Sequence, residues 1–232
     1  AKNAANKALA EGVAAAIDQL ESNDGLRVAI ITGAGGTFCS GMDLKAFVTG
    51  ELPTVEGKGF AGLCEATIGK PVIAAVEGYA LAGGFEVAIS CDLIVAAEDA
   101  KFGIPEVKRG LAAGAGGLVK LPKQIPSRVA MELALTGDFI SAQRAYELGL
   151  INQVVPSGGA LEAARALAAK IAANGPLAVA VSKQVVAAAQ DWSTSEMFRE
   201  QTKIIQPVFT SEDAIEGATA FAEKRAPVWK GR

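Results

Sequence analysis

The chain contains no histidine, so any acid–base chemistry has to use other side chains. This absence excludes Ser-His-Asp and Cys-His nucleophilic sites and removes the commonest ligand of zinc and non-haem iron. Near neutral pH the remaining candidates are Asp, Glu, Lys, Cys or Tyr groups whose pKa values are shifted. Two glutamates, Glu86 and Glu106, stand in surroundings that invite such chemistry.

Glu86 lies in an apolar run, one helical turn after a pair of glycines. The run from Phe85 to Ile89 is otherwise apolar, and Gly83 and Gly84 precede it. Glycines after a strand and before a helix indicate a tight turn with close backbone approach. The amide of Gly83 is then an unsatisfied donor at the positive end of the helix dipole. Taken alone, Glu86 has a structural alternative as a helix-surface or ion-paired glutamate.

Glu106 follows Pro105 in a turn after an apolar strand, and alone it is best explained as a solvated loop acid or a cap. Two partly desolvated carboxylates raise at least one pKa, so that a protonated acid and an ionised base coexist near neutrality. Other polar side chains nearby are more readily explained as turn or packing residues: Asp43, Asp92, Cys39 and Ser40.

Two glycine-rich stretches, 33–36 and 114–117, could each cradle an anion at a helix start. Neither completes a nucleotide-binding pattern, because Phe38 stands where the first needs its third glycine and no clear strand precedes the second. Gly57-Lys58 is followed by another glycine rather than Ser or Thr, so it is not a P-loop. Nucleotide binding through these motifs is therefore disfavoured.

The bulk composition sets broader limits. A length of 232 residues predicts one main domain, and a net charge of −3 gives no basic face for nucleic acid or anionic lipid. The three cysteines, Cys39, Cys64 and Cys91, form no Cys-x-x-Cys pair and fit buried reduced thiols. No export signal is visible, and no apolar run approaches the roughly 18 residues of a membrane span. We expect a cytoplasmic protein.

The elements that must position the glutamates alternate in type. Leu9, Val13, Ile17 and Leu20 recur at helical spacing, and a buried strand is predicted over 27–32. Further strands are predicted over 71–76 and 93–97, with a buried helix over 85–89 between them. This alternation predicts the α/β class.

From Ser127 onward the pattern is nearly all helical. Helix starts are predicted at Ser141, Ser193 and Ser211, the second with a capping box to Glu196. Helix stops are predicted at Gly149 and Gly175. The Ala-rich helices 160–173 and 177–189 carry little side-chain bulk, which suits close packing within or between subunits.

Several pieces in fixed order resemble the crotonase superfamily, the enoyl-CoA hydratase/isomerase family. They are Ser40–Asp43, Ala82–Glu86, Phe102–Glu106, Gly114–Gly117, Leu135–Gly137, Ala145–Leu150 and Ala220–Arg225. Each piece is weak alone, but their order and spacing make the match specific over almost the whole chain. The runs 211–217 and 227–232 are similar to those of carnitinyl-CoA dehydratases and bacterial hydratases. The strand pair that opens the family fold before Asn3-Ala4 is absent from the printed sequence, and Ser40 and Ala82 replace the usual Ala and Gly.

The resemblance implies a crotonase-like spiral of β-β-α turns over 1–190 and a helical region over 191–232 that builds trimers or hexamers. It implies an acyl-CoA thioester substrate, a place in fatty acid metabolism, and no metal or redox cofactor. By the family pattern, the amides of Met42 and Gly83 form an oxyanion hole, Glu86 is the base that orients water, and Glu106 donates a proton to the α-carbon. The other expected substrate or CoA contacts are Ser40, Asp43, Gly84, Phe221 and Lys224.

Enoyl-CoA hydration is the function that the resemblance favours. Isomerases of this family usually lack the glutamate that matches Glu86, whereas both glutamates are present here. Three alternatives stay open: an enoyl-CoA isomerase, a substrate-specific dehydratase such as carnitinyl-CoA dehydratase, and a non-catalytic acyl-CoA-binding protein.

Overall fold

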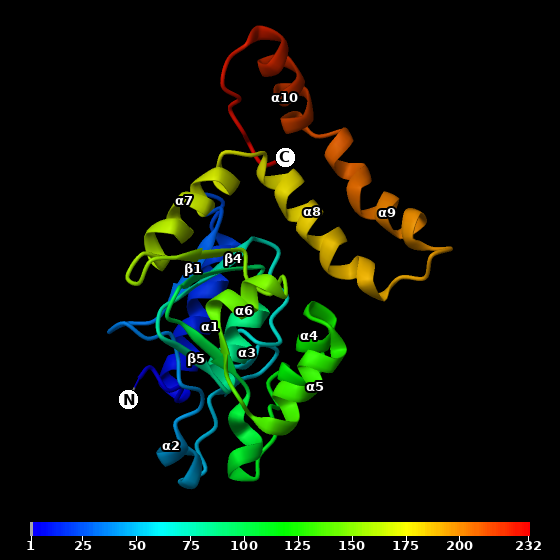
Figure 1. Cartoon of the computed structure of the whole chain (residues 1–232). Helices are drawn as coiled ribbons and strands as arrows, with labels where there is room; N and C mark the ends of the chain where they lie inside the picture. Colours follow the sequence, from blue (N-terminus) through cyan, green and yellow to red (C-terminus); the bar gives the residue numbers. More distant parts are fainter. Residues whose placement is uncertain (1) are drawn as a thin grey trace. The chain divides into compact units, whose positions relative to one another are not determined.

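The structure, a computed structural model, describes residues 2–232 and contains two compact units (Figure 1). The larger unit comprises residues up to Gln19, Ile30–Thr67 and Val72–Ala166, and the smaller one Leu20–Ala29, Ile68–Pro71 and Leu167–Arg232. The changeover at Leu167 groups the helix 176–188 with the C-terminal helices, whereas the sequence placed the boundary after residue 190.

The central sheet has four strands in the order β1-β4-β6-β9. Their bounds are β1 Ala29–Thr32, β4 Val72–Val76, β6 Leu93–Ala97 and β9 Gln153–Val155. β6 runs parallel to both β4 and β9, and every residue of β4 is buried. Such an unbroken apolar run is typical of a parallel strand covered on both faces, which is why β4 and β6 could be predicted within one residue.

A second sheet of three strands carries the candidate site. It contains β5 (Tyr79–Leu81), β7 (Lys101–Gly103) and β8 (Ile140–Ser141), with β5 parallel and β8 antiparallel to β7. The nearly all-helical pattern predicted after Ser127 did not identify the short strands β8 and β9. Strands of two or three residues are too short to show the alternation that identifies a strand in sequence.

The remaining elements of the larger unit surround these sheets (Figure 1). They are α1 (Lys7–Ser22), α2 (Leu44–Val48), the hairpin β2–β3 (Thr54–Val55, Gly59–Phe60), α3 (Gly83–Ser90), the 3₁₀ helix η1 (Pro105–Arg109), α4 (Gly117–Gln124), α5 (Ser127–Thr136), α6 (Ala142–Glu147) and the first part of α7 (Ala160–Ala172). The ring of Phe85 in α3 packs on that of Phe102 in β7 with centroids 5.6 Å apart. This contact joins the helix that carries one glutamate to the strand that precedes the other.

The smaller unit contains α8 (Pro176–Ala188), the short η2 (Ala189–Asp191), α9 (Met197–Phe209) and α10 (Glu212–Glu223). Ser211 caps α10 as predicted, accepting a hydrogen bond from the Ala214 amide. The C-terminal tail folds back on this helix, because the Asp213 carboxylate accepts from the amides of Lys230 and Gly231 at 2.6 and 2.9 Å.

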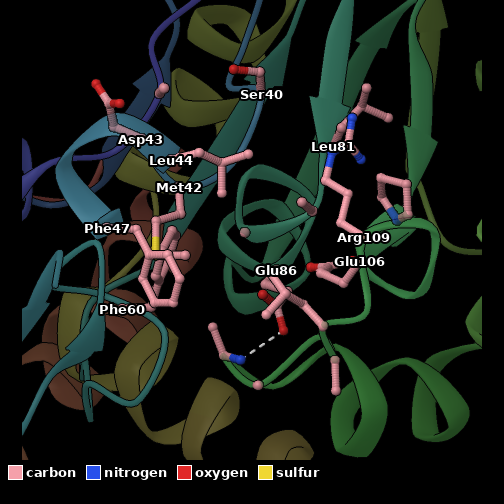
Figure 2. A pocket seen from close by; sticks show the side chains of 18 of the residues that line it. Ser40, Met42, Asp43, Leu44, Phe47, Phe60, Leu81, Glu86, Glu106 and Arg109 are labelled. Carbon is pink, nitrogen blue, oxygen red and sulfur yellow. Dashed lines mark hydrogen bonds between the residues drawn. The ribbon is translucent and has the colours of Figure 1, made fainter. Parts of the chain in front are cut away.

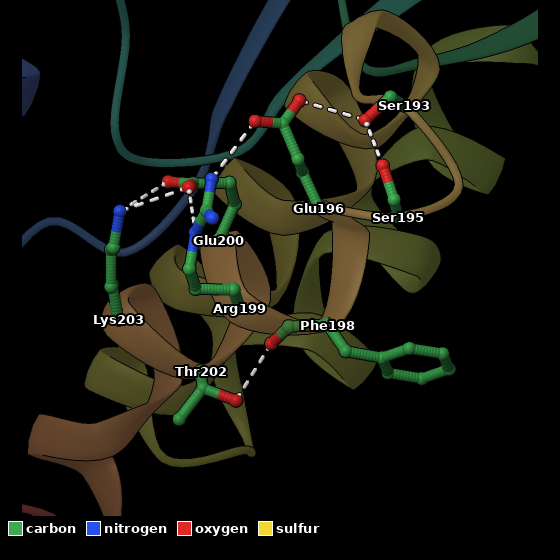
Figure 3. Close-up of polar contacts among 8 residues, drawn as sticks. All are labelled: Ser193, Ser195, Glu196, Phe198, Arg199, Glu200, Thr202 and Lys203. Carbon is green, nitrogen blue, oxygen red and sulfur yellow. Dashed lines mark hydrogen bonds and ion pairs between the residues drawn. The ribbon is translucent and has the colours of Figure 1, made fainter.

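The start of α9 differs from the predicted capping box. The N-cap residue is Glu196 rather than Ser193, and the Ser193 hydroxyl donates to the Glu196 carboxylate at 2.7 Å (Figure 3). Glu196 also binds Arg199, which in turn contacts Glu200. The Glu196 side chain, which the capping box was expected to direct back to Ser193 as N-cap, instead accepts hydrogen bonds from the Ser193 hydroxyl and from Arg199.

No single helix within residues 2–232 is long and apolar enough to cross a membrane, although α7 and α8 together, bent by 109° at their junction, have the length and composition.

Candidate active site

The two glutamates are brought together by the register of two parallel strands. Leu81 at the end of β5 pairs with Gly103 at the end of β7, and the Ala82 amide donates to the Gly103 carbonyl at 2.9 Å. Glu86 follows β5 on the first turn of α3, and Glu106 follows β7 on the first turn of η1. Functional groups at the carboxyl ends of adjacent parallel strands meet at one edge of the sheet. The carboxylates accordingly lie side by side (Figure 2).

The segment before Met42 lies along the other side of β5. Cys39 forms a parallel bridge with Ala80, and a Cβ added to Gly41 would lie 3.2 Å from the Gly83 amide nitrogen. The amides of Met42 and Gly83 are therefore neighbours. Neither donates a hydrogen bond to any part of the chain that the structure describes. Two unpaired N–H donors at one place are what an oxyanion hole requires, although that role stays a prediction.

The backbone turns sharply to present the Gly83 amide. Ala82, the N-cap of α3, has φ 51° and ψ −130°, a conformation that suits glycine and strains a residue with a Cβ. A Cβ at Gly83 would lie 2.4 Å from the Phe60 ring, so only glycine fits at the helix start. The family preference for glycine at position 82 thus has a conformational reason.

Ala82→Gly should stabilise the protein by about 1 kcal/mol, because the relief of backbone strain exceeds the entropy that glycine adds to the unfolded chain. Denaturant unfolding of the purified protein measures the change. The same substitution in ordinary helical backbone, Ala166→Gly at an exposed position of α7, should destabilise by about 1 kcal/mol. Equal losses for both variants would show that Ala82 is unstrained.

Glu86 is only 3% exposed and is held by main-chain donors. Its Oε1 atom accepts from the amides of Ala115 and Gly117, each at 2.8 Å. Burial raises the pKa of Glu86, whereas the Gly117 and Ala115 amides and the Lys120 ammonium lower it. With Oε1 held, no protein donor within residues 2–232 bonds to Oε2. A carboxylate fixed by one oxygen can orient a water with the other.

Glu106 has a less polar setting. Its Oε2 atom is buried and has no hydrogen-bond partner within the described chain. Burial is the main cause that raises its pKa to about 7, and the Glu86 charge adds to it, while its own amide and Arg109 act in the opposite direction. A carboxyl group that titrates near neutrality can serve as a proton donor.

Both glutamates line a cavity of about 780 Å³ that lies within the larger unit. Ser40, Met42 and Asp43, all predicted from the sequence, also line it (Figure 2). Gly83, likewise predicted, is a further lining residue. Much of the remaining wall is apolar, with contributions from Leu44, Phe47, Phe60, Leu81, Leu111 and Phe139. A hollow of this size with a few converging polar groups is typical of a small-molecule site.

Comparison with known proteins decides the family. A model of the enoyl-CoA hydratase/isomerase family matches residues 1–232. The chain belongs to the enoyl-CoA hydratase/isomerase family. A carnitinyl-CoA dehydratase of Salmonella typhi is 47% identical over 215 residues, which cover 89% of this chain and 82% of the relative.

Solved structures of the same family support the assignment. An enoyl-CoA hydratase from Mycobacterium tuberculosis H37Rv is 61% identical with a TM-score of 0.98, and the match covers 100% of this chain and 92% of that one. A carnitinyl-CoA hydratase from Mycobacterium avium is 46% identical with a TM-score of 0.77, and the match covers 100% and 91%. The resemblance to the crotonase superfamily and the predicted α/β spiral fold are therefore confirmed.

The other sequence-predicted residues of this family member lie in different places. Gly84 is buried and is not among the cavity-lining residues; a Cβ there would lie 2.2 Å from the Cys39 carbonyl oxygen, so packing explains this glycine. Asp43 lines the cavity and also caps α2, accepting from the Lys45 amide at 2.9 Å. Phe221 and Lys224 belong to the smaller unit, and their contacts with CoA stay a prediction.

Several residues of the site were missed in the sequence. The Ala115 and Gly117 amides hold Glu86, yet a main-chain donor leaves no side-chain signature. The glycine cluster 114–117 was the available signal, because a Cβ on Gly117 would lie 3.1 Å from Glu86 Oε1. Arg109 lines the cavity from the end of η1 and had no distinguishing motif.

Proposed function

We propose that this protein is an enoyl-CoA hydratase that adds water reversibly to 2-enoyl-CoA thioesters. The observation that carries the proposal is the pair Glu86 and Glu106 in one cavity, next to the unpaired amides of Met42 and Gly83. The apolar side chains of the wall suit an acyl chain. A family member that only bound acyl-CoA would need neither carboxylate.

The reaction follows from these positions. The thioester oxygen accepts from the amides of Met42 and Gly83, which stabilise the negative charge that develops on it. Glu86 takes a proton from a water whose oxygen forms the new bond to C3, and Glu106 gives its proton to C2. The two carboxylates lie side by side (Figure 2), so we expect both to act on the same face of the double bond, which gives syn addition. Proton exchange then restores Glu86 to the ionised state and Glu106 to the acid.

The proposed reaction uses no metal and no redox cofactor. Addition of water to a double bond transfers no net electrons, and the amides replace a Lewis acid at the thioester oxygen. Coenzyme A is part of the substrate.

The pH dependence should follow the two carboxylates. Because Glu106 has to be protonated and its pKa is raised to about 7, kcat/KM should fall as the pH rises through this region. Because Glu86 has to be ionised and burial raises its pKa, kcat/KM should also fall on the acid side. Initial rates of crotonyl-CoA hydration from pH 5 to 9 measure both limbs. A rate that stays level across this range would contradict the assignment of an acid and a base.

A substrate comparison tests the proposal against isomerisation. The hydratase should remove the absorbance of the enoyl thioester band when mixed with crotonyl-CoA, since hydration breaks the conjugation. An isomerase would leave crotonyl-CoA unchanged and would convert a 3-enoyl-CoA into the conjugated 2-enoyl-CoA, raising the same absorbance.

Carnitinyl-CoA dehydration is a second candidate, favoured by the 47% identical relative of that name. Its substrate carries a trimethylammonium group, which aromatic rings such as Phe47 and Phe60 could bind. Arg109, also on the wall, would repel that cation. Relative kcat/KM values for crotonobetainyl-CoA and crotonyl-CoA distinguish the two substrates.

We propose that the chain forms a homo-oligomer, a trimer or hexamer as in the family. α8 and α9 have no buried residue in the single chain, and large apolar side chains of the smaller unit are exposed: Val186, Phe198, Phe209, Ile215, Phe221 and Val228. Apolar faces of this extent usually pack against another subunit. Sedimentation equilibrium of the full chain tests this, and a stable monomer would contradict it.

Phe221 and Lys224 are proposed to contact the adenine and phosphate end of CoA. Lys224 ends α10, and Phe221 is 88% exposed. Lys224→Ala should raise KM for an acyl-CoA several-fold and leave kcat nearly unchanged, because an ammonium–phosphate contact is the same in the ground and transition states. Steady-state kinetics measure both constants, and an unchanged KM would remove this assignment.

We also propose that the protein is cytoplasmic and that it acts in fatty acid metabolism.

A further inference from the structure

The amides that hold Glu86 belong to a segment with little intrinsic rigidity. Gly114, Gly116 and Gly117 lead into α4, and Gly116, the N-cap, has φ 114° and no side chain to cap the helix. Such a segment is free to sample many conformations unless a contact fixes it. The placement of two donors on one oxygen of Glu86 therefore needs an external support.

Lys120 lies one turn along α4 and supplies contacts of this kind. Its Nζ atom donates to the Cys64 carbonyl at 2.5 Å and to the Ser90 hydroxyl at 2.8 Å. Its own amide donates to the Gly116 carbonyl at 2.7 Å, and its Cδ and Cε atoms would lie 3.2 and 3.3 Å from a Cβ on Gly116. The stem of Lys120 covers the glycine turn while its head is fixed elsewhere.

The partners of Lys120 lead back to Glu86. Ser90 is one turn beyond Glu86 on α3, and its hydroxyl donates to the Glu86 carbonyl at 2.7 Å. Cys64 precedes Glu65, which lines the same cavity. Lys120 thus joins α4, the last turn of α3 and the segment that follows β3.

We propose that Lys120 is a positioning residue for Glu86, because it ties the glycine-rich start of α4 to α3 and so holds the Ala115 and Gly117 amides on Glu86 Oε1. Its effect on catalysis rests on the proposed hydratase function. Its effect on the position of the amides does not.

The charges around Glu86 favour an electrostatic role as well. Glu86 faces Glu106 of η1, Cys64 of the segment after β3, and Lys120 of α4. Burial raises the pKa of Cys64 to about 12, so this thiol is neutral at physiological pH. Among these groups of the described chain, the Lys120 ammonium is the one that lowers the pKa of Glu86. Without it the base would take up a proton at higher pH.

Two variants separate positioning from mere packing. Lys120→Met keeps the stem but removes the donors and the charge, so kcat for crotonyl-CoA should fall about 10- to 100-fold with KM little changed. The acid limb of kcat/KM should move to higher pH. Lys120→Arg keeps the charge and the reach of the side chain, so both kcat and the acid limb of kcat/KM should stay close to those of the wild type. Lys170→Met in α7, which removes an ammonium far along the chain, should leave both unchanged.

Hydrogen exchange of the peptide 113–119 tests the positioning without reference to the chemistry. The amides of Ala115 and Gly117 should exchange faster in Lys120→Met than in the wild type or Lys120→Arg. Should Lys120→Met not fold, Lys120→Gln should keep the slow exchange through its amide donors and still shift the acid limb upward. Unchanged exchange together with an unchanged acid limb would overturn the proposal. If the wild-type protein does not hydrate crotonyl-CoA, the hydratase function is refuted. The exchange of the Ala115 and Gly117 amides still decides whether Lys120 positions them.

Discussion

Glu86→Gln should lower kcat/KM for hydration of crotonyl-CoA by about 100- to 10,000-fold, the range of general base catalysis. The amide keeps the size of the side chain and one oxygen that can accept from the Ala115 and Gly117 amides. What it loses is the ability to take a proton from water. The fold and the affinity for acyl-CoA should therefore survive, as measured by circular dichroism and by calorimetric titration with a saturated acyl-CoA.

A matched control for this variant is Glu98→Gln. Glu98 is an exposed glutamate directly after β6 and does not line the cavity, so the same chemical change there should leave the rate within about twofold of wild type. If Glu86→Gln hydrates crotonyl-CoA at nearly the wild-type rate, Glu86 is not the base, and the role proposed for it is wrong.

Glu106→Gln should be comparably damaging, and it should abolish a second, independent activity. Glu106 is proposed to hold the proton that C2 receives, so the wild type should also exchange the α-protons of a saturated acyl-CoA with solvent. An amide cannot carry that proton. Proton NMR of butyryl-CoA in D₂O measures the exchange, which we expect in the wild type and not in Glu106→Gln.

The exchange reaction also distinguishes the two glutamates. Glu86→Gln should retain a measurable part of α-proton exchange, since Glu106 is intact, while Glu106→Gln should lose it entirely. The reverse order would exchange the proposed roles of the two residues.

The sequence predicted the elements whose signal is local. β4 and β6 are buried apolar strands of five residues, and Ser211 is a side-chain cap with a recognisable spacing. β8 and β9 were missed because two or three residues carry no periodicity. The capping box at Ser193 was wrong because the local pattern does not say whether a serine begins the helix or binds the next carboxylate.

The candidate site divides in the same way. Gly83 and Glu86 belong to one motif and could be placed on one helix start from spacing alone. Glu106 needed the pairing of β5 with β7, a contact between segments about 20 residues apart that no single motif encodes. The hydrogen bonds from the Ala115 and Gly117 amides to Glu86, and the one from Lys120 to the Cys64 carbonyl, depend on tertiary packing. Only the structure could place them.

The most direct test of the hydratase account is mass spectrometry of the product formed from crotonyl-CoA by the wild-type protein in H₂¹⁸O. The account predicts a 3-hydroxyacyl-CoA that carries one ¹⁸O atom on C3, and in D₂O one deuterium on C2. Solvent water deprotonated by Glu86 supplies the oxygen, and Glu106, which exchanges its proton with solvent, supplies the hydrogen on C2. An unchanged mass, or a rearranged enoyl-CoA without solvent oxygen, would contradict hydration.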